Sequence, residues 1–201
     1  MRIILASKSP RRREILEMLG LKFEIIVSEV DETSDITDPT ALVRELASRK
    51  GRAVLDTLKA AGEDISDTLI ISSDTLVFCG DEILGKPCDR ADGERMLRLM
   101  SGREHTVASG VAAIYGGVCA VDSDATQVRF SQMSDDEISF YLNTNEYADK
   151  AGAYAVQGIA ALYIDGIDGD YFNVVGLPLR RLKLLLREAF GIDIESLAAA
   201  D

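Results

Sequence analysis

The sequence predicts an α/β fold in which helices flank a mixed, partly antiparallel sheet. Strand-like segments and segments of helical periodicity are interleaved along all 201 residues. Short glycine-containing turns join several neighbouring strand segments, which is typical of antiparallel hairpins. An apolar content of 47% is enough to fill one sizeable core. Because no linker or internal repeat interrupts this order, we expect a single domain over residues 1–201.

Two helices of the first half are predicted from the same local signal. Ser9 and Asp38 are good N-cap residues, and each precedes a proline, which suits the first position of a helix. Gly20 is a natural stop for the first of these helices. In this half we expect strands at 3–6, 23–27 and 69–79 and helices at 9–20 and 38–58.

The second half combines hairpin signals with one clear capping signature. Gly80 and Gly116 begin short turns between apolar segments. Ser134 followed by Glu137 is a capping box, which predicts a helix immediately after it. We expect a strand at 83–84, a helix at 89–102, strands at 107–115, 118–121 and 126–130, a helix at 138–142, a strand at 161–164 and a helix at 178–191.

Charge and composition exclude several classes of function. A net charge of -12 repels polyanions, so general nucleic-acid binding is not expected and a phosphate ligand needs locally concentrated cations. No apolar run is long enough to span a bilayer, and Lys8 interrupts the first run before it can serve as a signal sequence. Three cysteines without paired spacing predict reduced thiols. We therefore expect a cytoplasmic protein that does not bind membranes.

The first turn of the first helix carries an unusual run of three arginines, Arg11, Arg12 and Arg13. The free N–H groups and the positive end of the helix dipole already disfavour cations at this position. With Ser7 and Ser9, these guanidinium groups would form a cradle for a polyphosphate. The alternative is an ordinary basic helix end exposed to solvent.

Three further residues break local rules. Lys50 lies on the apolar stripe of its helix, where it either extends to water or projects a cation into a cleft. Asp74 interrupts an apolar strand segment, so it is either a turn residue or a functional group, namely a metal ligand or a general base. Glu32, in an acidic stretch, either helps to hold a cation or is simply solvated.

Two glycine-containing segments supply further candidates. Residues 80–86 nearly match a phosphate-binding loop, but Pro87 replaces the hydroxyl residue that such a loop needs, so that assignment is rejected. Lys86 is then either an isolated phosphate-binding cation or an exposed hairpin lysine. Gln157 lies in a segment whose glycines would let the backbone approach a ligand, although a plain turn fits equally well. We expect the lone His105 to be structural.

Together these segments resemble the Maf family, and the resemblance covers almost the whole chain. The N-terminal run Leu5-Ala6-Ser7-Lys8-Ser9-Pro10-Arg11-Arg12 matches the family's SxSPRR motif. The match continues through Val30-Asp31-Glu32, Lys50, Ser73-Asp74-Thr75-Leu76-Val77, Gly85-Lys86-Pro87, Ser101-Gly102 with His105, Lys150-Ala151-Gly152-Ala153-Tyr154 with Gln157-Gly158, and Val175-Gly176-Leu177-Pro178-Leu179.

The resemblance implies an elongated fold like that of inosine triphosphate pyrophosphatases, with two lobes around a cleft, in a homodimer. It also implies hydrolysis of a nucleoside triphosphate between the α and β phosphates with a divalent cation, Mg²⁺ or Mn²⁺. At Arg12, Thr75 and Gln157 the sequence resembles the branch of the family that acts on dTTP and UTP. A branch that acts on 7-methyl-GTP has different residues at these positions. The competing hypotheses are a pyrophosphatase for other or modified nucleotides and a non-catalytic, nucleotide-binding regulator of septum formation.

The implied roles place Asp74 at the centre of the chemistry, as general base or as metal ligand beside Glu32. The cations would neutralise charge on the phosphates. The Gln157 amide offers a donor and an acceptor to the edge of a uracil or thymine. The predicted substrate-binding residues are Ser7, Ser9, Arg11, Arg12, Lys50, Thr75, Lys86 and Gln157.

Overall fold

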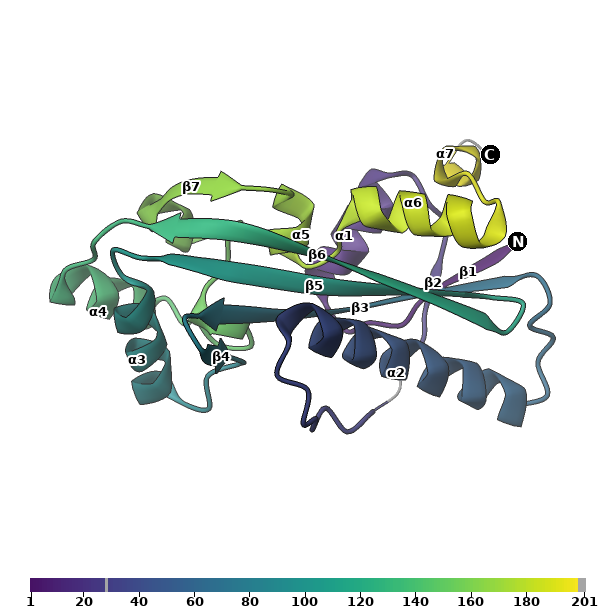
Figure 1. Cartoon of the computed structure of the whole chain (residues 1–201), viewed down its shortest axis with the longest axis horizontal. Helices are drawn as coiled ribbons and strands as arrows, with labels where there is room; N and C mark the ends of the chain where they lie inside the picture. Colours follow the sequence, from purple (N-terminus) through teal and green to yellow (C-terminus); the bar gives the residue numbers. More distant parts are fainter. Residues whose placement is uncertain (28, 199–201) are drawn as a thin grey trace. The chain divides into compact units, whose positions relative to one another are not determined.

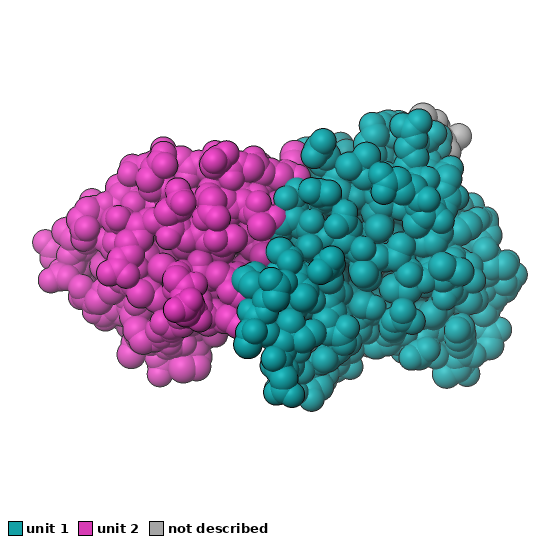
Figure 2. Space-filling view, in the orientation of Figure 1, with its two compact units in different colours: residues 1–74, 109–124, 176–201 teal, residues 75–108, 125–175 magenta. Residues whose placement is uncertain are grey.

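The computed structural model describes residues 1–27 and 29–198, which form two compact units (Figure 2). Unit 1 comprises residues 1–74, 109–124 and 176–201, and unit 2 comprises residues 75–108 and 125–175. The chain therefore passes from one unit to the other several times. The family resemblance treats these segments as one domain, which stays a prediction, as does the cleft between two lobes.

The strands form a mixed sheet. In the described residues seven strands pair in the order β2-β1-β3-β5-β6-β7, with β4 beside β3. The pairs β1–β2 and β1–β3 are parallel, and the pairs β3–β4 and β6–β7 are antiparallel. The predicted mixed, partly antiparallel sheet is thus confirmed. The strands are β1 (Arg2–Leu5), β2 (Glu24–Ile25), β3 (Thr68–Cys79), β4 (Glu82–Leu84), β5 (Glu104–Tyr115), β6 (Val118–Phe130) and β7 (Ile164–Asp168).

In unit 1, helices cover the strands on both faces (Figure 1). The long helix α2 packs its apolar stripe on one face, in a buried cluster that includes Val54 of the helix and Ile4 and Ile70 of the sheet. Figure 1 shows α1 and α6 on the opposite side of these strands. The helices of this unit are α1 (Pro10–Met18), α2 (Pro39–Ala60), α6 (Leu179–Phe190) and α7 (Ile194–Ala198).

An unusually close approach fixes α2 on the sheet. A Cβ atom added at Gly110 of β5 would overlap the main-chain carbonyl of Val43 in α2. Only glycine leaves room for this contact. The Ser72 hydroxyl on β3 also donates to the Ala47 carbonyl of α2 over 2.7 Å. These contacts hold α2, and with it Lys50, close to the sheet.

Unit 2 has its own apolar core, built from α3, α4 and the adjoining strands. Leu97, Met100, Phe130 and Tyr141 are almost completely buried in it. The predicted capping box is present, with Ser134 and Glu137 bonded reciprocally at the start of α4. The helices of this unit are α3 (Arg90–Met100), α4 (Asp135–Asn143), α5 (Tyr171–Val175) and the 3₁₀ segments η1 (Ala151–Ala153) and η2 (Ile159–Tyr163).

The predicted helices start where the local signals place them, whereas several strand boundaries differ. β5 begins at Glu104, three residues before its predicted start. The predicted strands 118–121 and 126–130 are one continuous strand, because pairing in the sheet carries the backbone through the acidic residues between them. Residues 161–163 form part of a 3₁₀ segment, and the strand begins only at Ile164. The strand predicted at 23–27 is reduced to Glu24–Ile25. None of the helices in the described residues is long and apolar enough to cross a membrane.

Candidate functional site

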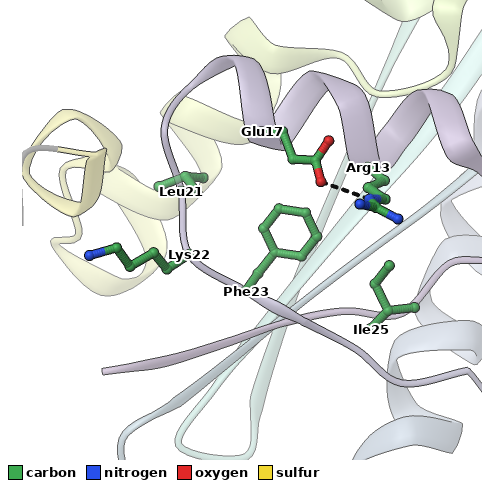
Figure 3. Close-up of a pocket in the computed structure, with 6 residues that line it drawn as sticks. All are labelled: Arg13, Glu17, Leu21, Lys22, Phe23 and Ile25. Carbon is green, nitrogen blue, oxygen red and sulfur yellow. Dashed lines mark hydrogen bonds and ion pairs between the residues drawn. The ribbon is translucent and has the colours of Figure 1, made fainter.

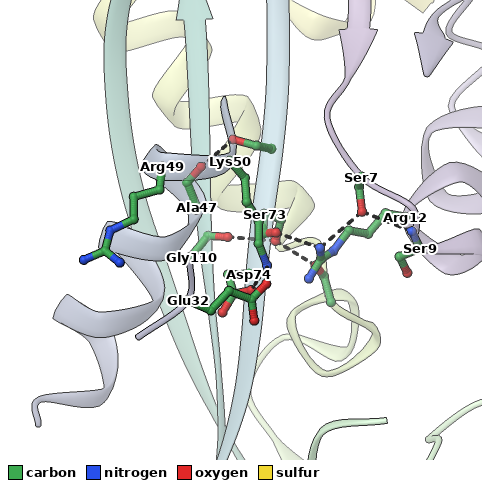
Figure 4. A network of polar contacts seen from close by, with 12 residues as sticks. Ser7, Ser9, Arg12, Glu32, Ala47, Arg49, Lys50, Ser73, Asp74 and Gly110 are labelled. Atoms are coloured by element: carbon green, nitrogen blue, oxygen red, sulfur yellow. Dashed lines mark hydrogen bonds and ion pairs between the residues drawn. The ribbon is translucent and has the colours of Figure 1, made fainter. Parts of the chain in front are cut away.

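A lysine and two carboxylates meet at Asp74, which is the last residue of β3 that belongs to unit 1. Lys50 on α2 forms an ion pair with Asp74 and a second one, over 2.7 Å, with Glu32 (Figure 4). The Asp74 side chain is only 9% exposed, whereas that of Glu32 is 59% exposed. A buried carboxylate needs a charged partner, and Lys50 supplies it. Lys50 therefore projects toward the acidic group, and the cleft around it stays a prediction.

Arg12 is bonded to the backbone that leads into Asp74. Its Nε donates to the Gly176 carbonyl over 2.8 Å, and its Nη1 donates to the Ser73 carbonyl over 2.6 Å (Figure 4). Nη1 also donates to the Ser7 hydroxyl over 3.3 Å. The guanidinium group thus ties together three segments that are distant in sequence. Arg12 holds the site's backbone as well as contributing a positive charge.

Two carboxylates and a second arginine lie close enough to Arg12 to influence its pKa. Burial lowers the pKa of Arg12, while the carboxylates of Asp74 and Glu32 act in the opposite direction. The neighbouring charge of Arg11 lowers the pKa further. The group nevertheless stays a cation, because an arginine in a protein does not lose its proton. Two arginines and two carboxylates therefore interact electrostatically within unit 1.

The start of α1 provides donors beside this cluster. Ser7 is buried and accepts a hydrogen bond from the Ser9 main-chain N–H over 3.2 Å. Ser9 is the N-cap residue, as predicted, but its side chain makes no capping hydrogen bond. The first turn contains no acidic residue that would offset the helix dipole. This helix end, with Arg11 and Arg12, keeps the features of a site for an anion.

Ser73 and Gly110 belong to the site although no motif argument singled out their contacts. The buried Ser73 hydroxyl lies 2.7 Å from the Gly110 carbonyl and 2.8 Å from the Gly176 carbonyl. The segment at Gly176 thereby receives bonds from both Ser73 and Arg12. A serine next to Asp74 in an apolar strand segment is the available sequence signal, but its partners lie far along the chain.

The remaining predicted residues belong to unit 2. Lys86 and Gln157 are exposed, and Thr75 is half-buried directly after Asp74 in β3. The Gly152 N–H donates to the Gly85 carbonyl over 3.0 Å, which links the segment of Lys86 to the glycine-rich segment of Gln157. Their approach to the unit 1 cluster stays a prediction.

The donor set suits a hard divalent cation. Asp74 and Glu32 both contact the Lys50 ammonium group, so their carboxylates face a common point. Mg²⁺ commonly binds one or two carboxylates and completes its shell with water and substrate phosphates. In residues 1–27 and 29–198, no group of three or more His, Cys, Asp or Glu side chains forms a metal site. A metal held here would thus take its remaining ligands from the substrate and water.

Two other features lie outside the predicted site. A hollow of about 470 Å³ is lined by Arg13, Glu17, Leu21, Lys22, Phe23 and Ile25, next to α1 and β2 (Figure 3). Arg13 is paired there with Glu17 over 2.7 Å, so the third arginine of the run has a different role from Arg12. His105 is buried and shares a hydrogen bond of 2.9 Å with Tyr154, which agrees with a structural role.

Solved structures and known relatives resemble this chain over most of its length. The Staphylococcus aureus Ham1 protein matches 94% of this chain and 100% of its own with a TM-score of 0.52, at 14% identity. That likeness concerns the fold alone and confirms the mixed α/β class.

Relatives named dTTP/UTP pyrophosphatase are much more similar in sequence. The one from Moorella thermoacetica is 47% identical over 196 residues, which is 96% of this chain and 97% of the relative. The one from Caldanaerobacter subterraneus subsp. tengcongensis is 44% identical over 194 residues, which is 96% of this chain and 91% of the relative. The pattern of the family described as Maf-like protein matches residues 2–189. This chain belongs to the Maf family.

Proposed function

We propose that this chain is a nucleoside triphosphate pyrophosphatase that hydrolyses dTTP and UTP to the monophosphate and pyrophosphate. One observation carries the proposal: Lys50, Asp74, Glu32 and Arg12 converge in unit 1 next to the amino end of α1. Cations beside a buried carboxylate are suited to a reaction in which a phosphate chain is neutralised and attacked by water. The names of the relatives support the same substrates.

In this proposal the residues of unit 1 act on the triphosphate. Arg11 and Lys50 neutralise negative charge on the phosphates, and the main-chain N–H groups at the start of α1 donate to phosphate oxygens. The Asp74 carboxylate either accepts the proton of the attacking water or holds the cation that activates this water, with pyrophosphate as the leaving group. Mg²⁺ or Mn²⁺, held by Asp74 and Glu32, would supply additional charge neutralisation.

The family resemblance adds residues of unit 2 to the proposal. Lys86 adds a further cation for the phosphates. The Gln157 amide pairs with the N–H and a carbonyl of uracil or thymine, which leaves groups unpaired with other bases. Only the family resemblance assigns Thr75 to the residues that select the base.

The proposal also includes location and assembly. Cys79, Cys88 and Cys119 are all free thiols, which suits the reducing cytoplasm. The homodimer is proposed from the family resemblance. Light scattering coupled to gel filtration would measure it directly, and a mass near 21.8 kDa would contradict it.

The decisive experiment measures pyrophosphate release from dTTP, UTP, CTP, GTP, 7-methyl-GTP and ITP with Mg²⁺ or Mn²⁺. We expect dTTP and UTP to be cleaved fastest and a chelator to stop release. Asp74→Asn should abolish release while nucleotide binding persists, whereas Asp56→Asn, at an exposed position on α2, should leave release unchanged. Faster cleavage of a purine nucleotide would overturn the assignment, and binding without release would identify a regulator.

A further inference from the structure

Glu146 is a half-buried carboxylate that binds the backbone two and three residues after Gln157. It accepts hydrogen bonds from the Ile159 N–H over 2.9 Å and the Ala160 N–H over 3.3 Å. The hydroxyl of Tyr141, a fully buried residue, donates to it over 3.1 Å. The carboxylate thus anchors the start of η2 to α4. Hydrogen bonds to a charged acceptor are stronger than neutral ones, so this anchor is firm.

Gly158 lets the carboxylate reach that position. Its φ of -138° is available to any residue, so backbone conformation does not require glycine there. A Cβ atom at Gly158 would, however, overlap the Glu146 carboxylate, so any larger residue there would displace that side chain. The backbone next to Gln157 is therefore in direct contact with Glu146. The Gly158 N–H also donates to the Ala155 carbonyl over 3.1 Å, which closes a turn around Gln157.

The segment before this turn is conformationally strained. Within the described ranges, 1–27 and 29–198, all non-glycine residues with positive φ lie here: Asn145 at 59°, Asp149 at 61° and Ala153 at 60°. A residue such as alanine keeps this conformation only where neighbouring contacts impose it. The Tyr154 hydroxyl, bonded to His105, holds the other end of the turn. These conformations are concentrated in one segment, and of the three residues only Ala153 lacks a short polar side chain that favours them, so contacts with its neighbours hold it there.

We propose that Glu146 is a positioning residue that fixes the turn presenting Gln157 and thereby sets the preference for uracil and thymine over other bases. This inference rests on the proposed function, in which the Gln157 amide pairs with the base. Glu146 itself contacts no substrate atom. Its effect passes through Gly158 and the first residues of η2.

The test compares kcat and KM for UTP and CTP, whose bases differ in the edge that Gln157 would read. In Glu146→Gln we expect the ratio of kcat/KM for UTP over CTP to fall about tenfold, mainly through a higher KM for UTP. Gly158→Ala, which displaces the carboxylate without removing it, should lower the same ratio. A matched control is Glu137→Gln, because that carboxylate also caps a helix of unit 2, at α4. It should change the melting temperature but not the ratio.

A double variant separates positioning from general destabilisation. Once Gln157→Ala has removed the amide, adding Glu146→Gln should change the UTP to CTP ratio no further. An additional drop in that background would overturn the inference, as would unchanged ratios in both Glu146→Gln and Gly158→Ala. If wild-type protein released no pyrophosphate from UTP, the proposed function itself would fail. If the wild type preferred UTP and the variants kept the same UTP to CTP ratio, only the role of Glu146 would be rejected.

Discussion

The Arg12 guanidinium group donates to the main-chain carbonyl of Ser73 over 2.6 Å, and Ser73 immediately precedes Asp74. A residue predicted to bind phosphate therefore also determines where the peptide bond before Asp74 lies. Its bond to the Gly176 carbonyl adds a second anchor from a distant segment. One side chain therefore both supplies a positive charge and holds the backbone of this site.

Replacing Arg12 by lysine should damage both stability and turnover. A lysine ammonium cannot reproduce the planar set of donors that reaches two carbonyls at once. We expect the free energy of unfolding to fall by about 2 kcal/mol and kcat for UTP to fall at least about tenfold. Urea unfolding and pyrophosphate release measure these two effects.

Arg13→Lys is the matched control, because Arg13 lies on the same helix and forms an exposed ion pair with Glu17 (Figure 3). It should change stability by less than about 0.5 kcal/mol. If Arg12→Lys unfolds like the wild type and only raises KM, Arg12 contacts substrate without holding the backbone.

Gly110→Ala should be strongly destabilising. The added methyl group would overlap the Val43 carbonyl, and neither a strand nor a long helix can shift cheaply. We expect a loss of about 3 kcal/mol in the free energy of unfolding. Gly85→Ala serves as the stability control, since nothing lies within 4 Å of its Cβ position. Equal midpoints of chemical denaturation for the two variants would contradict the close approach of α2 to β5.

His105 should make the protein less stable in acid. Burial lowers its pKa from 6.5 to about 4, so the folded state resists a proton that the unfolded state accepts. Stability from this residue is complete above pH 6.5, is lost as the pH falls toward 4, and changes little below that. The loss is of the order of 3 kcal/mol.

His105→Gln should lack this component, because glutamine does not titrate. Denaturant midpoints measured from pH 7 to pH 4 for both proteins provide the comparison. Parallel pH profiles for wild type and variant would show that the acid sensitivity arises elsewhere.

Local chemistry in the sequence was sufficient for the helix starts and for the unusual residues. Asp38 caps α2 through the Ala41 N–H over 2.7 Å, and Ser134 forms its capping box, because caps depend on residues within one turn. Lys50 and Asp74 stand out in the sequence because each breaks the pattern of its own element. The mixed sheet followed from the order of strand and helix segments.

Only the tertiary structure decided which partners these residues meet. Arg12 bonds to carbonyls 61 and 164 residues away, and no local pattern specifies such partners. The continuity of β6 and the contact of Glu146 with the turn at Gly158 likewise depend on packing between distant segments. Sequence determined which groups break the local rules, because propensity and polarity act over a few residues. The structure determined what those groups hold, because hydrogen bonds and close packing join residues that only the folded chain brings together.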